Sequence, residues 1–146
     1  MAWRNAWTML AVLMLGQIAM SSGSYLWGPL APFMVAELGV SKAEFGAVQS
    51  AFYVVGALMA TPAGVLADRF DGRWLLLLCL AAMAIPLALL SRAGSLHSVT
   101  VLAGLCGLGN GAINQVGARG VLHWFPPRRR ATAMGLRQTG NMLGAA

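Results

Sequence analysis

Arg137 is the residue whose chemistry stands out first in this sequence. It is the only charged residue between Ala131 and Ala146, in a stretch rich in apolar and small side chains. If a helix begins near Arg129, Arg137 lies roughly 12 Å along it, at 1.5 Å per residue. A charge in an apolar environment is costly unless it faces a polar cavity or a partner. Arg137 therefore predicts a polar cavity that attracts an anionic group.

Further polar side chains have spacings that place them in rows along helices. Asn141 follows Arg137 by one helical turn and Gln138 adjoins it, so both belong to the expected cavity. The first apolar block carries a stripe of Gln17, Ser21, Ser24 and Tyr25, and the fourth carries Asn110, Asn114, Gln115, Arg119 and His123. The candidate cavity residues are Arg137, Asn141, Gln138, Asn114, Gln115 and Gln17.

These polar rows have a second interpretation, in which they form hydrogen bonds between helices. Each such bond is worth roughly 0.6 kcal/mol inside a membrane, and this interpretation is slightly favoured for the Ser, Asn and Gln side chains. Arg119 is placed near a helix end, where it can pair with Asp68 or contact a substrate. For Arg137 the cavity is favoured.

Chemistry of other kinds is not indicated by the sequence. His97 and His123 lack metal-ligand spacing, and Cys79 and Cys106 both lie in apolar blocks, where a cysteine acts as a small hydrophobic side chain. There is no nucleotide-binding loop, catalytic triad or metal cluster in the sequence. We therefore expect no enzymatic activity and no cofactor.

Composition shows which elements must position these residues. Of the 146 residues, 58% are hydrophobic and 10% are charged, and the mean hydropathy is +0.70. A soluble domain carries about 25% charged residues, so the composition excludes a soluble globular enzyme and a disordered tail. The long apolar blocks predict an all-α, polytopic membrane protein, with four complete transmembrane helices and the start of a fifth. The expected spans are 7–30, 45–66, 74–90, 98–122 and 129–146, the last one truncated. A secretory signal peptide is the weaker alternative for the first block.

The distribution of basic residues predicts the orientation of these spans. With the N-terminus in the cytoplasm, six arginines fall in cytoplasmic segments (Arg4, Arg69, Arg73, Arg128, Arg129 and Arg130). Only Lys42 and Arg92 fall outside. This asymmetry satisfies the positive-inside rule and accounts for the net charge of +6 without a nucleic-acid partner. Trp3, Trp7, Trp27, Trp74 and Trp124 fall near span ends, as interfacial tryptophans do.

Helix boundaries and close contacts are also indicated by local patterns. Ser41 and Glu44 form a capping box that begins a helix, and Pro126-Pro127 ends one. Pro86 should kink the third span. Small residues recur every four positions, at Ala103, Gly107 and Gly111 and again at Gly140 and Gly144. This spacing lets helix backbones approach closely.

The loop from Gly64 to Arg73 resembles the signature between helices 2 and 3 of the major facilitator superfamily, G-x-x-x-D-[RK]-x-G-[RK]-[RK]. Gly64, Asp68, Arg69 and Arg73 match this pattern, whereas Asp71 occupies the glycine position and Gly72 a basic one. Segments 37–50, 108–111, 123–131 and 135–140 resemble other parts of the family's first five helices. An arginine common in proton-driven members is replaced by Ala103, which argues against a proton-coupled drug antiporter.

The resemblance implies the N-terminal portion of a secondary transporter in the plasma membrane, working by alternating access on a small solute. The expected partners are the lipid bilayer, the solute and the missing C-terminal helices, without which the chain should not transport. Arg137 favours an organic or inorganic anion as the solute. Family knowledge further implies a gating loop of Gly64, Asp68, Arg69, Gly72 and Arg73. In it, Asp68 latches the two halves of the transporter by facing a helix N-terminus of the other half.

Three alternatives belong to other classes. A small four-helix membrane scaffold or assembly protein fits the length, but it leaves the signature loop and Arg137 unexplained. A small dimeric multidrug transporter would need a carboxylate within a span, and none of the four acidic residues lies there. A membrane-embedded enzyme is the least favoured, because no cluster of His, Asp or Glu supports it.

Overall fold

A computed structural model describes the backbone of residues 2–145 and the side chains of residues 6–37 and 39–145. The side chains of Trp3 and Arg4, which enter the expected orientation, lie outside this range. The described residues form helices and no strand. The helices are α1 (Ala2–Tyr25), α2 (Trp27–Leu38), α3 (Lys42–Arg69), α4 (Gly72–Leu90), α5 (Leu96–Trp124) and α6 (Pro127–Leu143).

Four of the helical segments described are long and apolar enough to cross a membrane. They are Ala6–Glu37, Lys42–Arg69, Gly72–Leu90 and Leu96–Trp124. Large apolar side chains cover the outside of the bundle; for example, Leu15 is 65% exposed, Leu58 72% and Trp74 74%. Such a surface suits lipid and not water. The all-α membrane fold expected from the sequence is confirmed.

The first membrane segment differs from its expected form in length and continuity. It was expected to end at Leu30, but helical structure continues to Leu38 and is interrupted at Leu26. Pro29 explains the interruption, since it has no amide to donate to the carbonyl of Tyr25 and its ring crowds that carbonyl. Gly39 ends the segment in the left-handed conformation, with φ 63°, which glycine adopts without strain.

The other helices begin and end at capping residues. Ser41 and Glu44 form the expected capping box, in which the Glu44 amide donates to Ser41 Oγ (3.2 Å) and the Ser41 amide donates to Glu44 Oε2 (2.7 Å). Asp71 caps α4 by accepting from the amide of Arg73 at 2.9 Å. Pro126 and Pro127 separate α5 from α6, and Pro127 is the first residue of α6, a position at which no amide donor is needed.

Glycines bring α5 into backbone contact with α3. A methyl group at Gly111 would overlap the carbonyl oxygen of Gly56, and one at Gly107 would overlap that of Phe52. Gly140 and Gly144 give α6 a similar approach to α1, where added methyl groups would lie 3.0 Å from the Met14 carbonyl oxygen and 2.6 Å from that of Ile18. The close approach expected from the small-residue spacing is confirmed.

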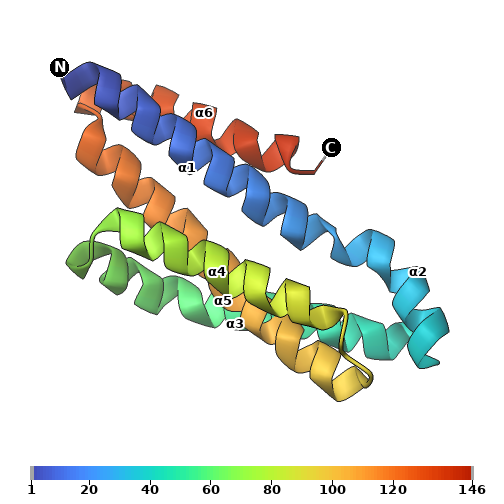
Figure 1. Cartoon of the computed structure of the whole chain (residues 1–146). Coiled ribbons are helices and arrows are strands. Elements are labelled where there is room, and N and C mark those ends of the chain that lie inside the picture. The colour runs from blue at the N-terminus through green and yellow to red at the C-terminus, as the bar shows by residue number, and fades with distance from the viewer. Residues whose placement is uncertain (1, 146) are drawn as a thin grey trace.

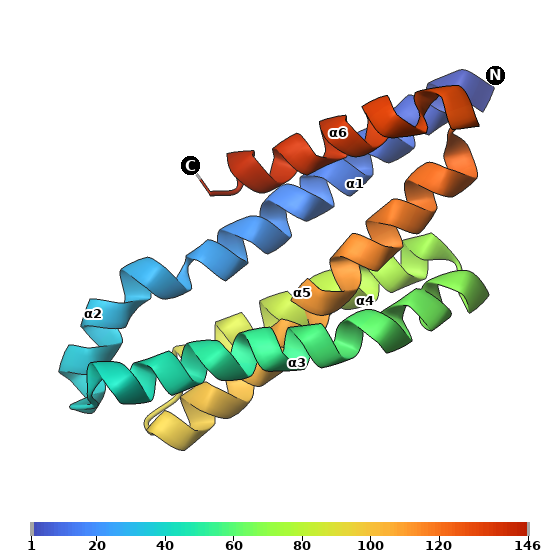
Figure 2. The same ribbon diagram turned by 180° about the vertical axis from the view of Figure 1, so that it is seen from behind.

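The helices fall into two groups joined by α5. In both views α6 lies alongside α1 and begins at the same end as the N-terminus (Figure 1; Figure 2). Helices α3, α4 and α5 pack together, and α5 also contacts α1 and α6. The polar rows of α1, α5 and α6 therefore meet where these three helices converge.

Candidate functional site

Arg137 lies buried where α1, α5 and α6 meet, a region called here the arginine junction (Gln17, Asn114, Gly117 and Arg137). Its side chain is only 4% exposed. Nη1 donates to the backbone carbonyl of Asn114 at 3.2 Å, and Nη2 donates to Asn114 Oδ1 at 3.1 Å. One residue of α5 thus holds two nitrogens of the guanidinium.

Gly117 makes room for this arrangement. A methyl group at Gly117 would overlap Nη1 of Arg137, so the guanidinium rests against the α5 backbone one turn beyond Asn114. The sequence did not single out Gly117, because a glycine inside a helix does not reveal which side chain from another helix will cover it.

Counter-charge is absent from the described surroundings of Arg137. The four acidic residues of the chain are Glu37, Glu44, Asp68 and Asp71, and all four lie in or beside the terminal turns of helices. Of these four, Asp68 forms an ion pair with Arg119. Arg137 is therefore compensated by neutral oxygens of Asn114, and its charge can attract an anion.

Other candidate cavity residues hold the helices together, as their second interpretation stated. Ser21 on α1 donates to Asn141 Oδ1 on α6 at 2.5 Å. Ser24 donates to Asn110 Oδ1 on α5 at 3.0 Å and also to the Met20 carbonyl. These bonds connect α1 to both α5 and α6, and they bring Asn141 to the same three-helix region as Arg137.

The remaining candidates differ in their exposure. Gln17 is 4% exposed, and its Oε1 has no hydrogen-bond partner in the described structure. Asn114 is exposed although it binds Arg137, so the junction reaches the surface there. Gln115 is half-buried and Gln138 is exposed. Arg137, Asn114, Gln17 and Asn141 thus lie on the three helices that converge here, and their role as cavity residues stays a prediction.

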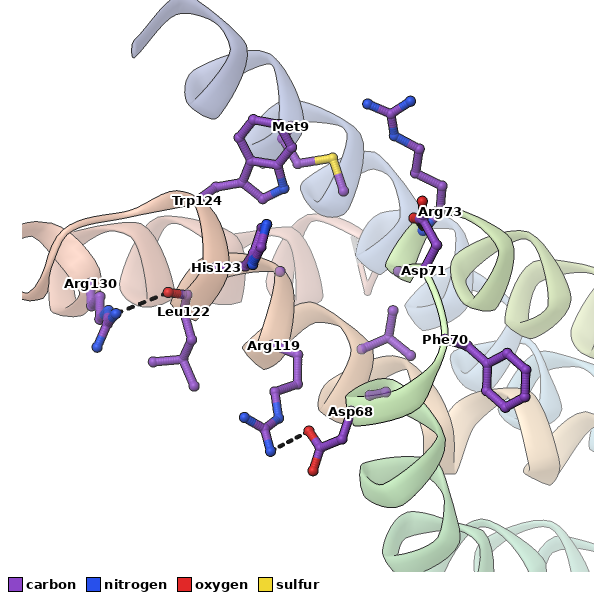
Figure 3. A pocket seen from close by; sticks show the side chains of 14 residues that line it. Met9, Asp68, Phe70, Asp71, Arg73, Arg119, Leu122, His123, Trp124 and Arg130 are labelled. Carbon is purple, nitrogen blue, oxygen red and sulfur yellow. Dashed lines mark hydrogen bonds and ion pairs between the residues drawn. The ribbon is translucent and has the colours of Figure 1, made fainter. Parts of the chain in front are cut away.

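A hollow lies at the end of the bundle where α3 leads into α4. This pocket has a volume of about 920 Å³ and is lined by residues of α1, α3, α4, α5 and α6, together with the α3–α4 loop. Asp68 and Arg119 point toward one another across it and form an ion pair (Figure 3). Both side chains are about half exposed, where such a pair contributes about 0–1 kcal/mol. The structural partner expected for Arg119 is thus confirmed.

The gating-loop residues surround this pocket unevenly. Asp68, Gly72 and Arg73 line it, whereas Arg69 is the last residue of α3 and Gly64 lies earlier in that helix. Asp71, in the glycine position of the family pattern, serves as the N-cap of α4.

Arg130 has a role that charge counting did not reveal. Its guanidinium donates to the carbonyl of Leu122 at 3.0 Å (Figure 3) and to the carbonyl of Phe125, also at 3.0 Å. It thereby satisfies carbonyl groups at the end of α5, where a positive charge also favours the helix dipole. Among the residues described, no group of three His, Cys, Asp or Glu side chains could hold a metal ion.

Membrane-spanning helices with a polar junction between them and an ion pair at one end define an integral, polytopic membrane protein. Residues 13–146 match the Major Facilitator Superfamily, and the chain belongs to this family. Its backbone is similar to that of a bacterial homologue of the human lysosomal transporter Spinster, solved in an inward-facing and occupied conformation. The TM-score is 0.83 at 19% identity, over 96% of this chain and 30% of that one.

Several characterised or named relatives match the sequence. The chain is 28% identical over 116 residues to the hexuronate transporter of Bacillus subtilis, covering 80% of this chain and 28% of that protein. It is 32% identical over 136 residues to a probable nitrate/nitrite antiporter of Thermus thermophilus, covering 91% and 30%. It is 30% identical over 110 residues to the D-galactonate transporter of Escherichia coli, covering 75% and 26%. The chain thus spans less than a third of the length of these relatives.

Proposed function

We propose that this chain is the N-terminal portion of a secondary transporter that moves a small anion across the plasma membrane by alternating access. Family membership supports the transporter class, and the relatives are named for hexuronate, nitrate or nitrite, and galactonate, all of which are anions. The observation that carries the choice of an anion is the buried Arg137, which lacks an acidic partner among the residues described.

The position of Arg137 favours a ligand-binding role over a purely structural one. It lies roughly 15 Å along α6 from Pro127, at 1.5 Å per residue, and therefore well inside the bilayer if α6 crosses it. A charge at that depth costs several kcal/mol. Asn114 offers hydrogen bonds but no negative charge, so an anion bound beside Arg137 would supply the missing compensation.

The gating loop is proposed to act at the end of the bundle where α3 leads into α4. Asp68 pairs with Arg119 in this structure, and the family resemblance implies that it can also face a helix N-terminus of the other half. A weak, exposed pair can be exchanged for such a contact at little cost. Asp68 would then bias the equilibrium between outward-facing and inward-facing states without contacting the substrate.

We further propose that the N-terminus is cytoplasmic and that additional C-terminal helices complete the transport pathway. The charge asymmetry of the loops supports the orientation, and the relatives, of whose length the matched region covers less than a third, support the larger assembly. A stable, monodisperse 146-residue product would instead favour the small membrane scaffold.

Uptake by the full-length protein in liposomes tests the proposal. Radiolabelled hexuronate, galactonate and nitrate are offered to wild type, to Arg137→Met and to Arg92→Met, which removes a positive charge from the α4–α5 loop. We expect uptake of at least one anion by wild type and by the Arg92 variant, and at least a tenfold loss in Arg137→Met. Wild-type kinetics in Arg137→Met at equal expression would refute the role of this arginine, and absence of uptake of every anion would refute the anion class.

A further inference from the structure

Two buried polar atoms of the arginine junction have no partner in the described structure. They are Oε1 of Gln17 on α1 and Nε of Arg137 on α6, and each of these side chains is only 4% exposed. Buried polar atoms are almost always hydrogen-bonded, so two unpaired atoms in one region (called the orphans below) require an explanation. One of them is an acceptor and the other is a donor.

The two orphans lie on helices that are in direct contact. Cβ of Gln17 is 3.4 Å from the position that a Cβ would take at Gly140, and Gly140 lies one helical turn beyond Arg137. Gln17 and Arg137 therefore approach the junction from neighbouring turns of α1 and α6. The junction reaches the surface through Asn114, whose side chain is exposed.

Several neighbouring polar groups already bind one another. Asn114 takes Nη1 and Nη2 of Arg137, and Ser21 and Asn141 bind each other. The fully buried groups of the junction that a ligand could pair are therefore a donor, the Nε–H of Arg137, and an acceptor, Oε1 of Gln17. A ligand must present an acceptor and a donor of its own to leave no buried group unpaired.

We propose that the transported solute is a hydroxylated organic anion, such as a hydroxycarboxylate or sugar acid, with Gln17 as a specificity-determining residue. This inference rests on the proposed anion transport. The carboxylate accepts from Arg137, and a hydroxyl group donates to Oε1 of Gln17. Nitrate has no donor group, so it satisfies Arg137 and leaves Oε1 of Gln17 unpaired. A site that hydrogen-bonds a hydroxyl group rejects analogues that lack it for this reason.

Glycolate and acetate form a matched pair of probes, because they differ by one hydroxyl group. Their binding to the purified full-length protein is measured by competition with uptake and by ligand-induced thermal stabilisation, with D-glucuronate and nitrate in parallel. We expect wild type to bind glycolate about tenfold more tightly than acetate, the factor that one satisfied buried hydrogen bond provides. D-glucuronate should bind more tightly than nitrate.

The variant Gln17→Met removes the acceptor while keeping the length of the side chain, and Gln49→Met makes the same change on α3 as a control. We expect Gln17→Met to bind glycolate and acetate about equally, with an acetate affinity within twofold of wild type. The control variant should keep the wild-type preference for glycolate. Equal binding of glycolate and acetate by wild type, or an unchanged preference in Gln17→Met, would overturn the inference. Both results leave anion transport intact, whereas failure of every anion to bind would refute the proposed function itself.

Discussion

Replacing Asn114 with aspartate tests the electrostatic role of Arg137 with almost no change of shape. Asn114 Oδ1 lies 3.1 Å from Nη2 of Arg137, and an aspartate oxygen can occupy the same place. The substitution converts a hydrogen bond to a neutral acceptor into an ion pair. Because Asn114 is exposed, the new carboxylate keeps part of its hydration, and the pair should stabilise the junction by about 1–2 kcal/mol.

The effect on anion binding should be opposite and larger. A substrate anion beside Arg137 would lie roughly 6 Å from the new carboxylate, where two like charges repel by about 3 kcal/mol at an effective dielectric constant of 20. That repulsion corresponds to a loss of affinity of about 100-fold. Asn114→Asp is therefore expected to raise the melting temperature while it weakens anion binding.

The assay measures thermal unfolding and the concentration dependence of uptake in the full-length protein. Gln49→Glu adds the same charge to α3, away from the junction, and controls for a general effect of negative charge. Wild-type affinity in Asn114→Asp would show that Arg137 does not attract the substrate. A lower melting temperature would refute the assignment of Asn114 as the partner of Arg137.

Three further predictions concern the contact between Gly117 and the Arg137 guanidinium, the gating loop and the first turn of α3. Gly117→Ala should displace the guanidinium and weaken anion binding about tenfold, the effect of losing a charge-assisted hydrogen bond. In the control variant Gly46→Ala the added methyl group meets nothing within 4 Å, so its anion affinity should equal that of wild type. Equal anion affinity in the two variants would contradict the contact assigned between Gly117 and Arg137. Asp68→Asn should slow transport but leave substrate affinity unchanged, as measured by uptake rate and competition; unchanged uptake would remove the gating role. Ser41→Ala should destabilise the protein by about 1 kcal/mol in chemical unfolding without altering affinity, and an unchanged stability would show that the capping box contributes nothing.

Local and periodic features of this fold could be predicted from the sequence. Capping by Ser41 and Glu44 depends on residues three positions apart, and the close approach at Gly107 and Gly111 follows from a four-residue repeat. The convergence of Arg137 with Asn114 was also foreseeable, because each lies on the polar row of its own helix and such rows avoid lipid.

Other features could not be predicted from hydropathy, residue spacing and charge counting. The interruption at Leu26 lies within a continuous apolar run, and hydropathy does not reveal that Pro29 removes a bond one turn earlier. Gly117 and Arg137 lie on different helices, so the local sequence around either residue does not reveal their contact. Arg130 was counted only as a charge, although the structure shows it bonded to the end of α5.

The backbone contact between α3 and α5 has a consequence for how this sequence can vary. At Gly107 and Gly111 even a single methyl group meets a carbonyl oxygen of the facing helix, so almost every amino-acid substitution there should be selected against. At outward positions such as Leu58, which is 72% exposed, any apolar residue serves equally well. Sequence divergence should therefore accumulate in stripes along each helix, and the least variable stripe should run through residues without side chains.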